Sequence, residues 1–203
     1  TLFNSIVGHH PIDRGSVRFA GRDLAHLGVP DVARLGLLRT FQQAHVYDGM
    51  TCVRNMQVST SHAGERLLAM LRQFPPEATD KAHGLLDFVG LTELRDEVAG
   101  NLSYGQRKLL ELAMALMNEP KMLLLDEPTA GINPTLINSV IDRLKLANTS
   151  LGITLLVIEH NMRVIMNLAQ HIYCLAHGKL LAAGTPDEIR NDPRVIDAYL
   201  GAR

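Results

Sequence analysis

The sequence predicts an α/β fold in which a mostly parallel sheet forms the core and a helical subdomain is inserted into it. Residues 122–125 form a continuous apolar run, and residues 153–158 are rich in apolar and β-branched side chains. Both patterns favour strands that are buried on two faces. Each is followed by apolar residues at helical spacing, over 136–146 and 162–168. Strands that alternate with helices favour a parallel sheet covered by helices.

Length and composition favour a single globular domain over residues 1–203, because 203 residues are enough for one sizeable core and few for two. The 20 basic and 21 acidic residues give a formal net charge of −1. No net positive field attracts nucleic acid, so we expect no nucleic-acid partner. The two cysteines, Cys52 and Cys174, are too few for a disulfide framework. The apolar runs are shorter than the roughly 18 residues that span a bilayer.

The part of the chain before residue 50 predicts four short elements. Residues 1–8 have the pattern of a helix that ends at a glycine, and residues 16–19 alternate polar and apolar side chains like a strand. A proline and an aspartate favour a short helix over residues 31–35. Residues 38–41 predict a further strand.

From about residue 50 to 117 the sequence becomes helical. Apolar residues recur at three- and four-residue spacing over 65–71 and 82–89, with a break at Pro75-Pro76. Residues 107–117 carry another apolar face. We therefore expect a helical subdomain at about 50–117, inserted into the α/β core.

The last part of the chain predicts a hairpin and two short helices. Residues 172–175 and 179–183 are candidate strands, and helices are expected after Pro186 and Pro193. No linker is long enough to mark a covalent domain boundary, which again favours one domain.

Two adjacent carboxylates, Asp126 and Glu127, follow the apolar strand at its C-terminal end. Ligands of open α/β sheets bind at this edge. Adjacent strand residues point to opposite faces, so one carboxylate can bind Mg²⁺ while the other polarises an attacking water. The alternative is an ordinary surface turn after a core strand.

Ser103, Tyr104, Gly105 and Gln106 stand immediately before or within the start of a predicted helix. A hydroxyl and a glycine at a helix N-terminus present backbone N–H groups and the positive end of the helix dipole, which suits an anion. The alternative is that Ser103 is an ordinary helix cap.

Two more polar side chains follow predicted strands. Gln42 ends the strand at 38–41, and its uncharged side chain is suited to reach a metal or a water. Glu159 and His160 follow the strand at 155–158. A lone histidine at this place is more often structural or simply exposed than functional.

The order and spacing of these motifs resemble the ATP-binding subunit of ABC transporters over essentially the whole chain. The matching positions are Gln42, the signature Leu102–Gln106, the strand ending at Asp126 with Glu127, the segment Ala130–Pro134, and His160. The resemblance implies the P-loop NTPase-like α/β fold of the ABC ATPases, with ATP and Mg²⁺ as cofactors.

A narrower resemblance is to the branched-chain amino-acid importer type. Tyr104 stands where most ABC proteins have a second glycine, and Ala-Gly-Ile-Asn-Pro stands where many have Ala-Leu-Asp. Residues 184–190 and 198–201 also resemble that subfamily. Urea, other amino-acid and lipopolysaccharide systems remain alternatives, as do soluble ABC ATPases without a membrane partner and a non-hydrolysing partner subunit.

The resemblance implies a role for each motif residue. Catalytic roles fall to Glu127, which activates water, and His160, which contacts the γ-phosphate. The metal is supported by Asp126 and Gln42. The remaining nucleotide contacts are Thr1 and Gln42 in one subunit and Ser103, Gly105 and Gln106 toward the facing one.

The resemblance also implies partners and a location. A second ABC ATPase subunit completes a homodimer or heterodimer, and polytopic permease subunits bind it at the membrane. A periplasmic substrate-binding protein acts indirectly. The expected location is the cytoplasmic face of the inner membrane, as a peripheral subunit.

The 203 residues contain no Gly-x-x-x-x-Gly-Lys-Ser/Thr run, the loop whose backbone holds phosphates. Gly178-Lys179 does not provide one, because Leu180 follows it and Tyr173 stands at the first glycine position. In relatives this loop directly precedes a segment like the one that starts at Thr1. We therefore expect an N-terminally truncated sequence, and a 203-residue polypeptide that hydrolyses ATP very poorly.

Overall fold

The structure is a computed structural model that describes residues 2–40, 46–60 and 74–199. Contacts group the chain into two compact units, Thr1–Ile158 and Glu159–Arg203. The expectation of one domain over residues 1–203 stays a prediction.

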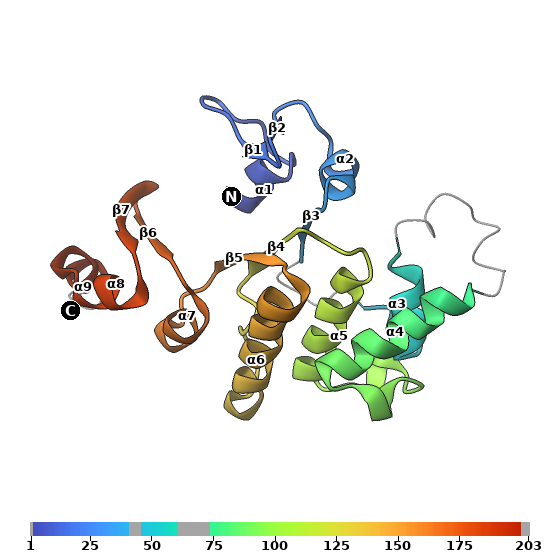
Figure 1. Ribbon diagram of the computed structural model, residues 1–203. Coiled ribbons are helices and arrows are strands. Elements are labelled where there is room, and N and C mark those ends of the chain that lie inside the picture. The colour runs from blue at the N-terminus through green and yellow to red at the C-terminus, as the bar shows by residue number, and fades with distance from the viewer. Residues whose placement is uncertain (1, 41–45, 61–73, 200–203) are drawn as a thin grey trace. The chain divides into compact units, whose positions relative to one another are not determined.

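A parallel sheet lies at the centre of the first unit. It contains β3 (Leu37–Arg39), β4 (Met122–Asp126) and β5 (Thr154–Ile158), in the order β3-β4-β5 (Figure 1). The register pairs Arg39 with Leu124 and Asp126 with Ile158, so the C-terminal ends of β4 and β5 meet at one edge. The prediction of a parallel sheet is confirmed.

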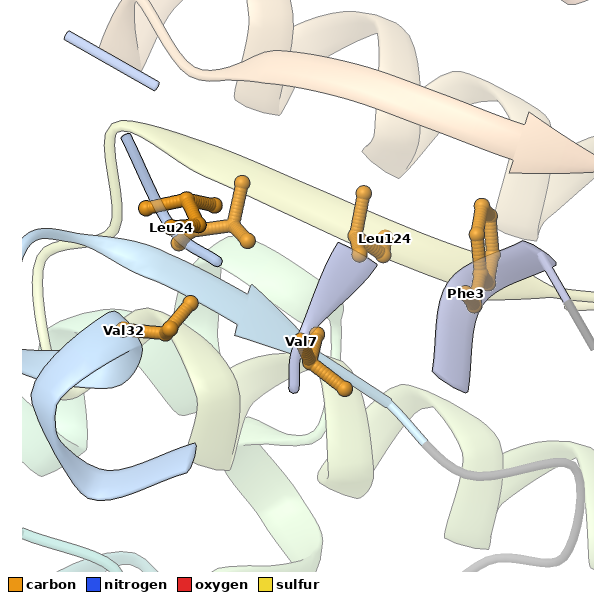
Figure 2. Packing of buried hydrophobic residues seen from close by; sticks show 6 residues of the cluster. Phe3, Val7, Leu24, Val32 and Leu124 are labelled. Carbon is orange, nitrogen blue, oxygen red and sulfur yellow. The ribbon is translucent and has the colours of Figure 1, made fainter. Parts of the chain in front are cut away.

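One face of this sheet packs against the N-terminal elements, which are α1 (Leu2–Ile6), β1 (Arg18–Phe19), β2 (Arg22–Asp23) and α2 (Val29–Arg34). Their buried side chains form a hydrophobic cluster with the strands, drawn in Figure 2: Phe3, Val7, Leu24, Val32, Leu37 and Leu124. The expected strand at 16–19 begins only at Arg18 and pairs with β2, an antiparallel strand that the sequence did not predict. The helix expected over 31–35 begins earlier, because Pro30 fits its first turn.

The opposite face of the sheet is covered by α5 (Tyr104–Leu116) and α6 (Pro134–Leu151). Leu125 of β4, Leu109 of α5 and Val140 of α6 line the same small cavity of about 20 Å³. Asn133 caps α6 by accepting the N–H of Thr135, and the helix ends at Gly152 in the left-handed conformation.

Between β3 and β4, the described residues form helices: α3 (Cys52–Val58), α4 (Pro76–Val89), two short 3₁₀ turns at Thr92–Leu94 and Ala99–Asn101, and α5. One isolated bridge joins Thr51 to Val98. This agrees with the helical character expected at 50–117. The helical pattern at 65–71 lies outside the described residues.

The second unit contains α7 (Met162–Leu168), β6 (Ile172–Ala176), β7 (Lys179–Gly184), α8 (Pro186–Asn191) and α9 (Pro193–Tyr199). Strands β6 and β7 form the expected hairpin, and both helices begin at the expected prolines. Alternate residues of β6, Ile172 and Cys174, face a small core completed by residues of β7, α8 and α9. Among the described helices, none combines the length and hydrophobicity that crossing a bilayer requires.

Candidate functional site

The C-terminal edge of β4 and β5 presents the two adjacent carboxylates. Strand β4 ends at Asp126, and the backbone N–H of Glu127 donates to the carbonyl of Ile158 over 2.8 Å. Glu127 has φ +49°, a left-handed conformation that is uncommon for a residue with a side chain. Glu127 is therefore a strained turn residue rather than the next residue of the strand. The expectation that the pair alternates like two strand residues is wrong.

Asp126 is held by an arginine that sequence reasoning missed. Arg39, the last residue of β3, donates from Nη2 to Asp126 Oδ2 over 2.9 Å. Its Nη1 donates to Asn4 of α1, and its guanidinium lies 5.6 Å from the centre of the Phe3 ring. The available signal was a basic residue, Arg39, at the end of a strand that lies next to a strand ending in a carboxylate, Asp126.

Ser103 is a helix cap, as the alternative interpretation of the sequence predicted. Its hydroxyl accepts the N–H of Gln106, while Gln106 Oε1 accepts the N–H of Ser103 over 2.8 Å. This reciprocal pair is a capping box. It engages one backbone donor at each of these two residues, and whether the helix start also binds an anion stays a prediction.

The start of α5 packs against the segment that follows the carboxylates. A Cβ at Gly105 would lie 2.7 Å from Leu136 Cδ1, and a Cβ at Gly131 would lie 3.3 Å from the Tyr104 ring. Gly131 also has φ +72°. The N–H of Ala130 donates to the carbonyl of Glu127, so the segment turns immediately after the carboxylate pair. At Gly131 the same segment lies against Tyr104 of the signature.

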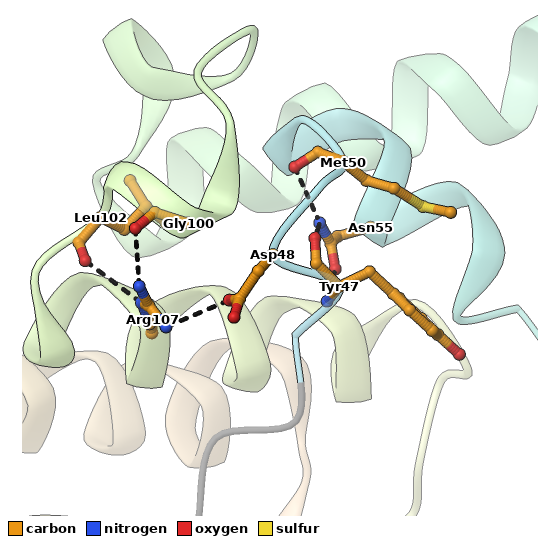
Figure 3. Close-up of polar contacts among 7 residues, drawn as sticks. All are labelled: Tyr47, Asp48, Met50, Asn55, Gly100, Leu102 and Arg107. Atoms are coloured by element: carbon orange, nitrogen blue, oxygen red, sulfur yellow. Dashed lines mark hydrogen bonds and ion pairs between the residues drawn. The ribbon is translucent and has the colours of Figure 1, made fainter.

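Arg107 fixes the backbone that enters α5 (Figure 3). Its Nε and Nη2 donate to the carbonyls of Leu102 and Gly100 over 3.2 and 2.7 Å, and its Nη1 pairs with Asp48 over 3.1 Å. Asp48 lies in the short segment before α3, which Asn55 holds through bonds to the Tyr47 backbone and the Met50 carbonyl. One arginine thus links the signature to the segment that follows the predicted Gln42 position.

The remaining predicted site residues are Thr1, Gln42 and His160. Thr1 and Gln42 lie outside the described residues. His160 belongs to the second unit, where its backbone N–H donates to the carboxylate of Glu159 over 3.2 Å. Asn161, the next residue, caps α7.

The carboxylates at this edge suit magnesium. Mg²⁺ takes oxygen ligands and is usually bound through one or two carboxylates, with water and phosphate oxygens completing its shell. Within the described ranges, no group of three or more His, Cys, Asp or Glu residues is arranged to hold a metal without such help. The carboxylate oxygens of Asp126 and Glu127 are donors of the kind that Mg²⁺ takes.

Comparison with known proteins agrees with this fold and motif order. The ABC transporter family profile matches residues 1–130, and a profile described as branched-chain amino acid ATP-binding cassette transporter matches residues 179–203. The probable branched-chain amino acid transport ATP-binding protein LivG of Archaeoglobus fulgidus is 36% identical, over 100% of this chain and 80% of its own. BraF of Pseudomonas aeruginosa, a high-affinity branched-chain amino acid transport ATP-binding protein, is 37% identical over 99% and 82%.

Solved structures show the same architecture. The ATP-binding cassette MJ1267 in its ADP conformation superposes with a TM-score of 0.84 at 35% identity, covering 98% of this chain and 82% of that one. The chain therefore belongs to the ATP-binding cassette family of ABC transporter proteins. Within that family it is an ATP-binding protein of the branched-chain amino acid transport type, which confirms the narrower resemblance drawn from Tyr104 and the segment Ala130–Pro134.

Proposed function

We propose that this protein is the ATP-hydrolysing subunit of an ABC importer for branched-chain or other hydrophobic amino acids. Family membership and the names of its relatives support the transported substrate class. The observation that carries hydrolysis is the pair Asp126 and Glu127 at the C-terminal end of β4, the edge where ligands of parallel α/β sheets bind.

The two carboxylates take different tasks in this proposal. Asp126 supports Mg²⁺, which when bound supplies positive charge against the phosphates of ATP. Glu127 orients the attacking water and accepts its proton. Its backbone bond to Ile158 anchors it to the neighbouring strand, which suits a group that must be held in place.

The remaining motif residues complete the nucleotide contacts. Gln42 contacts the metal or the water, Thr1 lies at the phosphate side, and His160 contacts the γ-phosphate. Ser103, Gly105 and Gln106 stand at the positive end of α5 and act on the nucleotide of a second subunit.

This arrangement requires partners. The proposal includes a second ABC ATPase subunit in a homodimer or heterodimer, and polytopic permease subunits that hold the protein at the cytoplasmic face of the inner membrane. A periplasmic substrate-binding protein delivers the amino acid and acts on this subunit only indirectly.

Hydrolysis is tested with Glu127→Gln in the protein expressed from its native gene. Removing the proton acceptor is expected to lower ATP turnover about 100-fold or more while ATP binding persists. Glu119→Gln, which changes an exposed carboxylate paired with Lys81, is the matched control and should leave turnover unchanged. Full turnover in Glu127→Gln would contradict the assignment. The polypeptide of the 203 residues alone should turn over ATP very slowly, because it contains no phosphate-binding loop.

The transported class is tested separately by uptake. Deleting the gene should abolish uptake of labelled leucine and leave uptake of labelled urea unchanged, and the tagged protein should copurify with polytopic membrane subunits. Loss of urea uptake with normal leucine uptake would contradict the proposed substrate.

A further inference from the structure

We propose that Arg39 is a positioning residue for Asp126, holding this carboxylate in the orientation in which it meets the magnesium–nucleotide complex. This inference rests on the proposed function, because it takes Asp126 as a magnesium-supporting residue. Arg39, together with its anchor on α1, thereby joins the residues that act on the nucleotide.

The strand pattern explains why Arg39 reaches this carboxylate. Alternate residues of a strand share a face, so Arg39 lies on the same face as Leu37, and Asp126 on the same face as Leu124. Leu37 and Leu124 belong to the same buried hydrophobic cluster as Phe3 of α1, and Figure 2 shows Leu124 and Phe3 in it. The basic and the acidic side chain therefore continue this face beyond the hydrophobic cluster, at the neighbouring ends of two paired strands.

The contacts hold the guanidinium at both ends. Nη2 donates to Asp126 Oδ2 over 2.9 Å, and Nη1 donates to Oδ1 of Asn4 on α1. The side chains of Arg39 and Asp126 are only 15% and 22% exposed, and the Phe3 ring lies beneath the guanidinium. Since the arginine is fixed to a helix and a strand, it holds the carboxylate against rotation.

The third guanidinium nitrogen of Arg39 makes no such contact. Its Nε is buried and has no hydrogen-bond partner among the described residues. Buried donors are normally satisfied, and an unsatisfied one is unfavourable. The contacts with Asp126 and Asn4 therefore hold the guanidinium in a position in which its Nε has no hydrogen-bond partner among the described residues.

A fixed carboxylate is a better metal ligand than a mobile one. Groups that hydrogen-bond a metal-binding side chain set its orientation, and losing them typically lowers metal affinity about 10- to 100-fold. Arg39 is thus expected to matter for nucleotide binding in the presence of Mg²⁺ and to matter little in its absence.

The test measures the dissociation constant of ADP in Mg²⁺ and in EDTA, using the protein expressed from its native gene. The magnesium ratio, which is the dissociation constant in EDTA divided by that in Mg²⁺, reports the contribution of the metal. Arg39→Gln should reduce this ratio about tenfold or more. Arg39→Lys should give an intermediate value, because an ammonium keeps the charge but lacks the planar fork of donors. Arg34→Gln, at an exposed ion pair with Asp31 on α2, is the control and should leave the ratio unchanged.

A second readout needs neither nucleotide nor metal. In EDTA, the losses of melting temperature in Arg39→Gln and Asp126→Asn should be non-additive in the double variant, because each removes the same contact. Should Arg39→Gln fail to fold, Asn4→Ala keeps the arginine and removes its anchor to α1. This variant should lower the magnesium ratio by a smaller factor.

The outcomes separate this inference from the proposed function. If Asp126→Asn abolishes the magnesium ratio while Arg39→Gln leaves it as in the unaltered protein, the positioning role is wrong and the proposed site stands. If Asp126→Asn also leaves the ratio unchanged, or the unaltered protein shows no magnesium dependence, both are wrong.

Discussion

Gly131 gives the sharpest test of how the segment after the carboxylates is fitted to the start of α5. Alanine at this position meets two obstacles. The backbone has φ +72°, which disfavours any residue with a Cβ, and the new Cβ would lie 3.3 Å from the nearest atom of the Tyr104 ring. Gly152 is a matched control, because it has φ +68° and no atom within 4 Å of the position that a Cβ would take.

The expected magnitudes follow from these two terms. A left-handed backbone costs an alanine about 1–2 kcal/mol, and the lower entropy of the unfolded chain offsets about 0.4–1 kcal/mol of that. Gly152→Ala should therefore lower the free energy of unfolding by about 1 kcal/mol. Gly131→Ala should lose about 1 kcal/mol more, because overpacking against the ring adds to the backbone term.

The assay is thermal unfolding, followed by circular dichroism. In a chain of this size each kcal/mol corresponds to about 2–4 °C, so Gly131→Ala should lose roughly twice as much melting temperature as Gly152→Ala. Adding Tyr104→Ala should reduce the effect of Gly131→Ala to that of the control. Equal losses in Gly131→Ala and Gly152→Ala, with no change when the ring is removed, would refute the contact between Tyr104 and Gly131.

Two further predictions concern a cationic and an acidic side chain. Arg107→Gln should lower the free energy of unfolding by about 2 kcal/mol, since it removes bonds to two carbonyls and to Asp48; a melting temperature within 1 °C of the unaltered protein would contradict this. The pKa of Glu188 is lowered by its bond to the backbone N–H of Thr185 and then by the hydroxyl of that residue. A carboxylate whose pKa is lower in the folded than in the unfolded protein stabilises the fold at pH values above its unfolded pKa. The contribution of Glu188 to the free energy of unfolding is therefore present at neutral pH and is lost as the pH falls through the folded pKa. Thr185→Ala should raise the pKa of Glu188 in an NMR titration, and an unchanged value would show that the hydroxyl plays no part.

The central strands and the C-terminal hairpin could be predicted because the burial of their apolar side chains leaves a recognisable pattern in the sequence. The apolar run that ends at Asp126 has few alternatives to a strand covered on both faces. Strand β2 (Arg22–Asp23) could not be predicted in this way, since it is polar and exposed, and its pairing follows from the turn that joins it to β1. Periodicity carries no signal for so short an element.

The residue types of the candidate site come from the sequence, whereas the contacts among them could not be predicted from it. The capping box at Ser103 and Gln106 is a local pattern that the sequence itself displays. The contact between Arg39 and Asp126 joins residues 87 positions apart and depends on which strands pair. Glu127 has a left-handed backbone, and its N–H donates to the carbonyl of Ile158 on the neighbouring strand, a pairing that no local pattern encodes.

The most direct measurement is the position of the metal in a crystal structure of the protein, expressed from its native gene, with a non-hydrolysable ATP analogue and Mn²⁺. The anomalous scattering of Mn²⁺ locates the ion. We expect the ion beside the Asp126 carboxylate at the end of β4, with the Glu127 carboxylate facing the terminal phosphate. An ion and nucleotide bound elsewhere, with Asp126 and Glu127 facing only solvent, would contradict this expectation.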